Sequence, residues 1–304
     1  MMIALSSLST ASMAQAAQRS GIDLTDLNQQ VKPGEDFYDY ACGGWMQKNP
    51  LPAAYSRYGS FDRLAEDNNK RINVILKDLQ EKTYPQGSVE QKLSDLYKLA
   101  MDSARREQDG LTPVMGLIQK MESAKTTAQL FDIQLEMMPY GDSEFFRAYI
   151  GADDKNAIRN ILNIYQGGLT LGQKDYYLET DEATTKIRES YKRHIVRMFQ
   201  LFGFKKAAAE KKMRNIFAVE LALAKVSKSR TELRDPIANY NKMTLKEFDG
   251  KYPHFQLERQ MNAKGIASQY IQEMIVGQPA FMSGADQLFS KMSPAEYRDY
   301  MEWG

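Results

Sequence analysis

The sequence is poor in the residue types that most often carry chemistry, since its 304 residues include one cysteine and two histidines. A single cysteine excludes a disulfide within the chain, even in an oxidising compartment. The two histidines, His194 and His254, are 60 positions apart, and the zinc-binding pattern HExxH is absent. We therefore predict that each histidine is a surface or structural residue and not a metal ligand.

Other signatures are missing as well. The net charge is +1, from 40 basic and 39 acidic residues, so charge gives no case for binding nucleic acid or an anionic membrane. The pairs Lys205-Lys206 and Lys211-Lys212 are predicted to lie on a solvated helix face. After the N-terminal segment no run of about 18 apolar residues occurs, so no membrane span is predicted. The GxSxG and GxxxxGK[ST] motifs are also absent, which leaves no nucleophile elbow or phosphate loop.

The first residues differ in composition from the rest. Residues 1–17 contain no charged side chain, and they end near Ala14-Gln15-Ala16, which fits the A-x-A pattern of a signal-peptide cleavage site. We interpret residues 1–16 as a signal peptide that lacks the usual positive start, the alternative being a flexible tail. The mature protein is accordingly expected to be secreted or periplasmic.

The remaining pattern is mainly α-helical. Residues 17–61 are expected to be irregular and to wrap another surface, and 62–304 to form a multi-helix domain. One antiparallel β-hairpin is predicted over 144–166, where β-branched and aromatic runs flank a polar turn. A long helix ending at Gly203 is predicted from one apolar stripe: Ile187, Tyr191, Ile195, Met198, Phe199 and Phe202. Among the shorter helices, one is predicted over 265–276.

The densest local feature is the stretch Asp36–Trp45, which holds four aromatic residues, Cys42 and the pair Gly43-Gly44. Aromatic rings bury large areas, and an unpaired cysteine is usually buried. A buried, structural Cys42 is therefore favoured over a catalytic thiol. The glycine pair permits either a sharp turn or a close approach of another backbone segment.

One residue is a candidate ligand-binding side chain. Arg57 lies in an extended stretch with Tyr58 and Phe61 close by in sequence. Its guanidinium group could hold a carboxylate through two parallel hydrogen bonds, and the rings could line an apolar pocket. An ordinary salt bridge at Arg57 remains the alternative.

A series of motifs in order resembles the neprilysin-like zinc metallopeptidase family. It begins with Asp36–Trp45 and Ser56–Phe61 and continues with Gln166–Leu171, Asp175–Leu178 and the Arg234-Asp-Pro236 to Tyr240-Asn segment. The resemblance covers nearly the whole chain after the N-terminal segment. It implies secreted or membrane-anchored zinc endopeptidases, in which a thermolysin-like catalytic domain and a helical domain enclose a chamber for peptides.

The same resemblance implies which residues are functional here. In the family the zinc ligands lie in the C-terminal half, which this chain is expected to lack, so no catalytic or metal-binding residue is assigned. Arg57 matches an arginine that binds the free C-terminal carboxylate of peptide substrates, and Phe61 matches an aromatic position beside it. A second family arginine is replaced by Ala65. Cys42 matches a cysteine whose usual partner lies near the family's C-terminus, so it should be a free thiol.

The sequence therefore predicts the N-terminal helical region of a secreted neprilysin-like zinc metalloendopeptidase. We expect it to enclose the peptide-binding chamber, to position substrate through Arg57 and Phe61, and to be inactive by itself, with zinc present only in full-length members. The alternative is a non-catalytic secreted helical binding protein that keeps the family scaffold. An unrelated periplasmic helical domain is a third possibility, which the ordered motifs disfavour.

Overall fold

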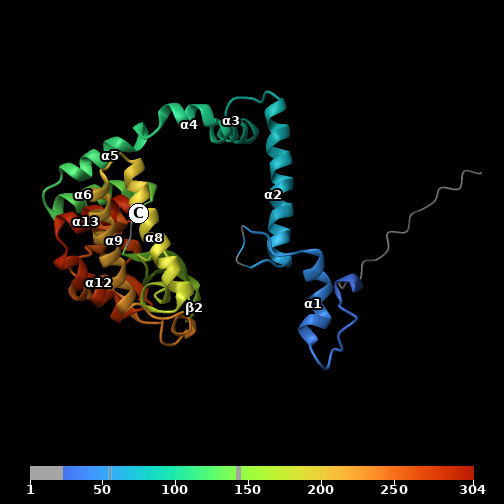
Figure 1. Ribbon diagram of the computed structural model, residues 1–304. Coiled ribbons are helices and arrows are strands. Elements are labelled where there is room, and N and C mark those ends of the chain that lie inside the picture. The colour runs from blue at the N-terminus through green and yellow to red at the C-terminus, as the bar shows by residue number, and fades with distance from the viewer. Residues whose placement is uncertain (1–22, 54, 56, 142–144) are drawn as a thin grey trace, which may run out of the picture. The chain divides into compact units, whose positions relative to one another are not determined.

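The computed structural model describes residues 23–304 except 54, 56 and 142–144, and the chain divides into two compact units, Met1–Arg105 and Arg106–Gly304. The signal peptide expected at residues 1–16 lies outside the described residues. Mainly α-helical structure is confirmed (Figure 1). The α-helices are α1 (Phe37–Lys48), α2 (Ser60–Asp78), α3 (Val89–Met101), α4 (Ser103–Asp109), α5 (Thr112–Ser123), α6 (Thr127–Met137), α7 (Asp175–Leu178), α8 (Glu182–Leu201), α9 (Lys206–Val226), α10 (Leu245–Lys251), α11 (Leu257–Ala263), α12 (Pro279–Lys291) and α13 (Pro294–Trp303). Within the described part of the chain, no helix is long and apolar enough to cross a membrane.

The segment before α2 is less irregular than predicted, because residues 37–48 form the helix α1. Asp36 begins this helix by accepting a hydrogen bond from the backbone N–H of Asp39. The Gly43-Gly44 pair lies inside the helix, where the short helix η1 (Leu24–Asp26) packs against it. A Cβ atom on Gly44 would lie 2.6 Å from the Thr25 carbonyl oxygen. Of the two predicted roles for the glycine pair, close backbone approach is the one observed.

Replacing Gly44 by alanine should therefore loosen this packing, although alanine is the better helix former. The clash is with backbone atoms that cannot rotate away, and we expect it to cost about 1–3 kcal/mol, more than the roughly 1 kcal/mol gained in helix propensity. Faster amide hydrogen exchange in residues 24–48 measures the effect. Gly34→Ala is the matched control, because a Cβ there meets nothing within 4 Å. Slower exchange in Gly44→Ala than in the parent would contradict the prediction.

The N-terminal unit, Met1–Arg105, has little core of its own. Among its described residues only Gly43 and Ser94 are buried. The amphipathic helices α2 and α3 leave most of their apolar faces exposed: Leu64, Ile72, Val74 and Ile75 on α2, and Val89, Leu93, Leu96 and Leu99 on α3. Apolar surface exposed on this scale is typical of a face that contacts another part of a protein. These faces lie after residues 17–61, the segment predicted to wrap another surface, and that prediction stays untested.

The second unit, Arg106–Gly304, contains a mixed four-stranded sheet in the order β1-β2-β4-β3. The predicted hairpin is confirmed as the antiparallel pair β1 (Phe146–Asp153) and β2 (Asn156–Gln166). The helix predicted over 265–276 is wrong, because β4 (Glu273–Val276) is a strand parallel to β2. Its apolar run is too short to show a period, and the pairing buries it completely. The strand β3 (Lys242–Thr244) completes the sheet.

The core of this second unit consists of two clusters. The larger joins the sheet to α5, α6, α11, α12 and α13. The smaller lies between α7, α8 and α9, and Figure 1 shows α8 and α9 side by side. The predicted stripe of α8 is buried at Tyr191, Ile195 and Phe199, and Gly203 follows the helix at φ 91° as predicted for its end. The helix α9 contributes side chains to both clusters and so links them.

Candidate functional site

The segment that carries Arg57 is held by its neighbours in sequence. The Tyr58 hydroxyl donates a hydrogen bond to Glu66 Oε2 at 2.8 Å, and the backbone N–H of Gly59 donates to Asp62 Oδ2 at 2.8 Å. Both acceptors lie on α2, so the first turns of that helix fix the segment. Arg57 itself is exposed, which leaves its guanidinium group available to a ligand.

A pocket of about 340 Å³ lies beside this segment in the N-terminal unit. Trp45 stacks on Tyr58 with ring centroids 6.1 Å apart, and both residues line the pocket. Cys42, a free and half-buried thiol, lines it as well. The Asp36–Trp45 stretch thus builds one wall from the face of α1. Three residues of its lining, Tyr58, Gly59 and Ser60, lie between the predicted substrate-binding residues Arg57 and Phe61 in the sequence.

Arg57 and Phe61 themselves lie outside the lining of that pocket. Phe61 stands in the first turn of α2, and 85% of it is exposed. Tyr58 therefore lines the pocket, whereas the two predicted substrate-binding residues, Arg57 and Phe61, are exposed at the surface. Their role in binding a peptide carboxylate stays a prediction.

The described residues do not fit a zinc site. They contain no group of three or more histidine, cysteine, aspartate or glutamate side chains placed to hold a metal ion. His254 is held by Asp286, which accepts from its backbone N–H at 2.9 Å and lies 2.8 Å from its Nδ1. His194 packs edge-on against Trp303 with centroids 5.9 Å apart. No step of peptide hydrolysis is therefore derived from these residues.

A buried ion cluster is the strongest electrostatic feature of the second unit. Lys212 Nζ on α9 donates to Glu122 at 2.8 Å, Asp299 at 2.8 Å and Glu302 at 2.6 Å. Only 5% of Lys212 is exposed, so the prediction of a solvated Lys211-Lys212 face is wrong for this residue. Burial opposes the charge on Lys212, but the three carboxylates outweigh it and raise the pKa of Lys212.

A second buried carboxylate is fully hydrogen-bonded. Glu220 on α9 accepts from the Thr170 backbone and hydroxyl, from the Tyr191 hydroxyl at 2.7 Å and from the Tyr177 hydroxyl at 3.1 Å. Burial raises the pKa of the Glu220 carboxyl, and these hydrogen bonds act against that rise. Each oxygen of Glu220 accepts two hydrogen bonds, so neither has a position left for a ligand. The bonds from Tyr177 and Tyr191 link α7 and α8 to α9.

The helical pattern of the sequence, unlike its net charge, indicates that Lys212 is buried. Lys212 falls on the buried stripe of α9, three residues after Ala209 and four before Ile216. A lysine at a core position of a helix needs a buried anion. Its partners Asp299 and Glu302 are 87 and 90 residues away, so the sequence could not identify them.

Comparison with known proteins gives a consistent result. Residues 33–304 match peptidase family M13. The chain is 32% identical over 237 residues to endothelin-converting enzyme 1 of Cavia porcellus, covering 76% of this chain and 31% of that protein. It is 29% identical over 289 residues to endothelin-converting enzyme 1 of Rattus norvegicus, covering 92% of this chain and 37% of that protein.

Similarity in fold extends to bacterial proteins. The crystal structure of the Mycobacterium tuberculosis zinc metalloprotease Zmp1 in complex with an inhibitor matches with a TM-score of 0.85 and 24% identity, over 93% of this chain and 43% of that chain. PepO from Lactobacillus rhamnosis matches with a TM-score of 0.71 and 18% identity, over 89% of this chain and 42% of that chain. The chain thus spans well under half the length of the relatives it matches.

Proposed function

This chain belongs to peptidase family M13 as the N-terminal region of a neprilysin-like metallopeptidase, and we propose that it is secreted, encloses the peptide-binding chamber and is not catalytic by itself. In this role Arg57 holds the terminal carboxylate of a peptide substrate, with Phe61 beside it. Zinc and the residues that hydrolyse the peptide belong to the part of the family's length that this chain does not cover.

One observation carries the proposal: residues 33–304 match the family, yet the chain covers only 31% of an endothelin-converting enzyme and 43% of Zmp1. The chemistry of the chain supports it. An HExxH zinc site places two histidines one helical turn apart, whereas His194 lies on α8 and His254 precedes α11.

Peptide hydrolysis by the purified chain is the direct test. With zinc chloride present, an internally quenched fluorogenic peptide should stay intact, because no described group is placed to hold the metal that activates water. Zmp1, a zinc metalloprotease, is the positive control under the same conditions. Hydrolysis that purifies with the chain and stops on adding a chelator would contradict the proposal.

The DNA beyond the Gly304 codon separates this proposal from a non-catalytic binding protein. An HExxH sequence roughly 150–250 codons downstream, in frame or after one frameshift, supports an M13 enzyme. A stop codon without such a motif favours the binding protein.

A further inference from the structure

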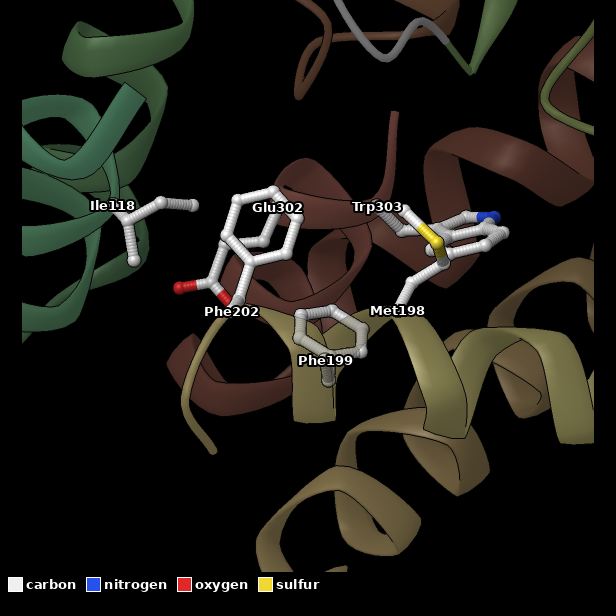
Figure 2. Close-up of a pocket in the computed structure, with 6 residues that line it drawn as sticks. All are labelled: Ile118, Met198, Phe199, Phe202, Glu302 and Trp303. Atoms are coloured by element: carbon white, nitrogen blue, oxygen red, sulfur yellow. The ribbon is translucent and has the colours of Figure 1, made fainter. Parts of the chain in front are cut away.

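A pocket of about 200 Å³ lies at the end of α13 in the second unit, and no part of the proposed function uses it. Figure 2 shows its lining. Glu302 and Trp303 come from the last turn of α13, and the other residues from α5 and the end of α8: Ile118, Met198, Phe199 and Phe202. Glu302 is thus one acidic residue among five apolar ones.

The Glu302 carboxylate has an unsatisfied position. Its side chain is fully buried, and its Oε2 accepts the hydrogen bond from Lys212. Its Oε1 is also buried and accepts no hydrogen bond from the described residues. A protonated Glu302 can hydrogen-bond to Glu122, so the position is open to an outside donor when Glu302 is ionised. Figure 2 shows the carboxylate on the Ile118 side of the pocket and the Trp303 ring on the other. A buried acceptor left unpaired is costly, which makes this oxygen a binding position for a donor from outside the described chain.

The charges around an ionised Glu302 do not balance. Lys212 and Arg298 are the cations of the cluster, and Glu122, Asp299 and Glu302 are its carboxylates. When Glu302 is ionised, two positive charges therefore face three negative ones in a buried setting, and when Glu302 is neutral the charges balance. One further cation at the pocket would neutralise the ionised cluster.

The apolar walls suit a cation on an organic body. Trp303, Phe199 and Phe202 present aromatic rings, whose faces attract ammonium and guanidinium groups. The same part of the protein already uses this contact, because Lys212 Nζ lies 5.5 Å from the Phe199 ring centroid and 4.7 Å from that of Phe204.

We propose that this pocket binds an ammonium or guanidinium group carried on an apolar body, with Glu302 Oε1 accepting its hydrogen bond. The aromatic rings pack around the apolar part of the ligand. The group has two possible sources, a free organic amine or the lysine or arginine side chain of a polypeptide, and both present the same chemistry to Glu302.

The electrostatics of the cluster set the pH dependence of binding. Burial raises the pKa of Glu302 to about 7, the hydrogen bond and charge of Lys212 act against that rise, and the charges of Glu122 and Asp299 add to it. Glu302 is therefore largely neutral at pH 6 and ionised at pH 8, and affinity for a cation should rise about tenfold between them. The charged and titratable groups that face Glu302 and Trp303 come from four helices: Glu122 on α5, Tyr191 and His194 on α8, Lys212 on α9, and Arg298 and Asp299 on α13.

The test uses the full chain with Trp45→Phe, which leaves Trp303 as the single tryptophan. Titration with n-hexylammonium chloride should change Trp303 fluorescence to saturation, and 1-hexanol should bind at least about tenfold more weakly because it lacks the charge. Glu302→Gln should weaken hexylammonium binding about tenfold and leave 1-hexanol unchanged. Glu210→Gln, on the more exposed part of α9, is the matched control and should change neither.

Further measurements keep the test decisive. If Glu302→Gln does not fold, the rise in affinity from pH 6 to pH 8 in the Trp45→Phe parent takes its place. His194→Gln must keep that rise, since histidine also changes charge in this range. Equal affinities for hexylammonium and 1-hexanol, unchanged binding in a folded Glu302→Gln, or loss of the pH dependence in His194→Gln would each overturn the proposal.

Two peptide ligands identify the source of the cation. Acetyl-Leu-Lys-Leu-amide is compared with its norleucine analogue and with n-hexylammonium. Tighter binding of the lysine peptide than of the free amine supports a polypeptide side chain as the natural ligand, and the reverse order supports a small amine. If neither cation binds better than its neutral analogue, the pocket is not a cation site.

Discussion

Replacing Lys212 by methionine should lower the free energy of unfolding of the second unit by about 3–5 kcal/mol, the range for removing one partner of a buried ion pair. Methionine keeps most of the volume of lysine, so a cavity would not account for the loss. The cause is instead the three carboxylates that lose their shared donor, Glu122, Asp299 and Glu302. Urea unfolding followed by Trp303 fluorescence in the Trp45→Phe background measures the second unit alone.

The neighbouring lysine provides a matched control. Lys211 is exposed on the same helix, so Lys211→Met makes the same chemical change at a solvated position. We expect its effect to stay within about 0.5 kcal/mol. Equal effects of the two substitutions would show that the buried cluster adds nothing to stability.

The loss in Lys212→Met should also grow with pH. The folded-state pKa of Glu302 is raised to about 7 from its usual value of 4.5. A carboxyl group with a raised pKa favours the folded state at low pH, and this contribution is lost as pH rises from about 4.5 through 7. At pH 5 the variant retains a neutral Glu302, whereas at pH 8 it holds three ionised carboxylates against Arg298. The difference from the parent should therefore be larger at pH 8.

Under the proposed function, in which this region is part of a complete M13 peptidase, replacing Arg57 by alanine in that peptidase should lower kcat/KM about 10- to 100-fold for peptides with a free terminal carboxylate. That range corresponds to the roughly 1.5–3 kcal/mol of a hydrogen bond to a charged group. Arg57 is exposed and its segment is held by Tyr58 and Gly59, so its removal should not disturb the fold. The measurement compares each free-acid peptide with its amidated form.

Two variants separate binding from an unspecific charge effect. Arg71→Ala removes another exposed arginine, from α2, and should change neither kind of substrate. Arg57→Lys keeps the charge but not the paired hydrogen bonds, so it should recover only part of the activity. Equal losses on free-acid and amidated peptides in Arg57→Ala would remove the assigned role.

Elements with a clear period or a clear turn could be predicted from the sequence. The hairpin in residues 144–166 and the stripe of α8 ending at Gly203 are examples. The strand Glu273–Val276 could not, because its identity depends on pairing with β2, more than 100 residues earlier. The helix α1 could not be predicted from the sequence either, because its two glycines have low helix propensity.

The candidate sites divide in the same way. The motifs from Asp36 to Tyr240 are sufficient to indicate the family, and they single out Arg57 and Phe61, whose roles stay predictions. The structure adds the pocket beside Tyr58 and places the two candidates outside its lining. No spacing rule could have supplied that placement, because the pocket joins α1 to the start of α2.

The sequence by itself determined the family, the mainly helical class and the scarcity of histidine and cysteine, since these follow from local motifs, periodicity and composition. Only the tertiary structure decided how Lys212, Glu122 and Glu302 meet, and that one carboxylate oxygen of Glu302 accepts no hydrogen bond from the described residues. Charge balance in a protein interior depends on which distant side chains are buried together. The number of charged residues can be read from the sequence, but which of them come into contact depends on the tertiary fold.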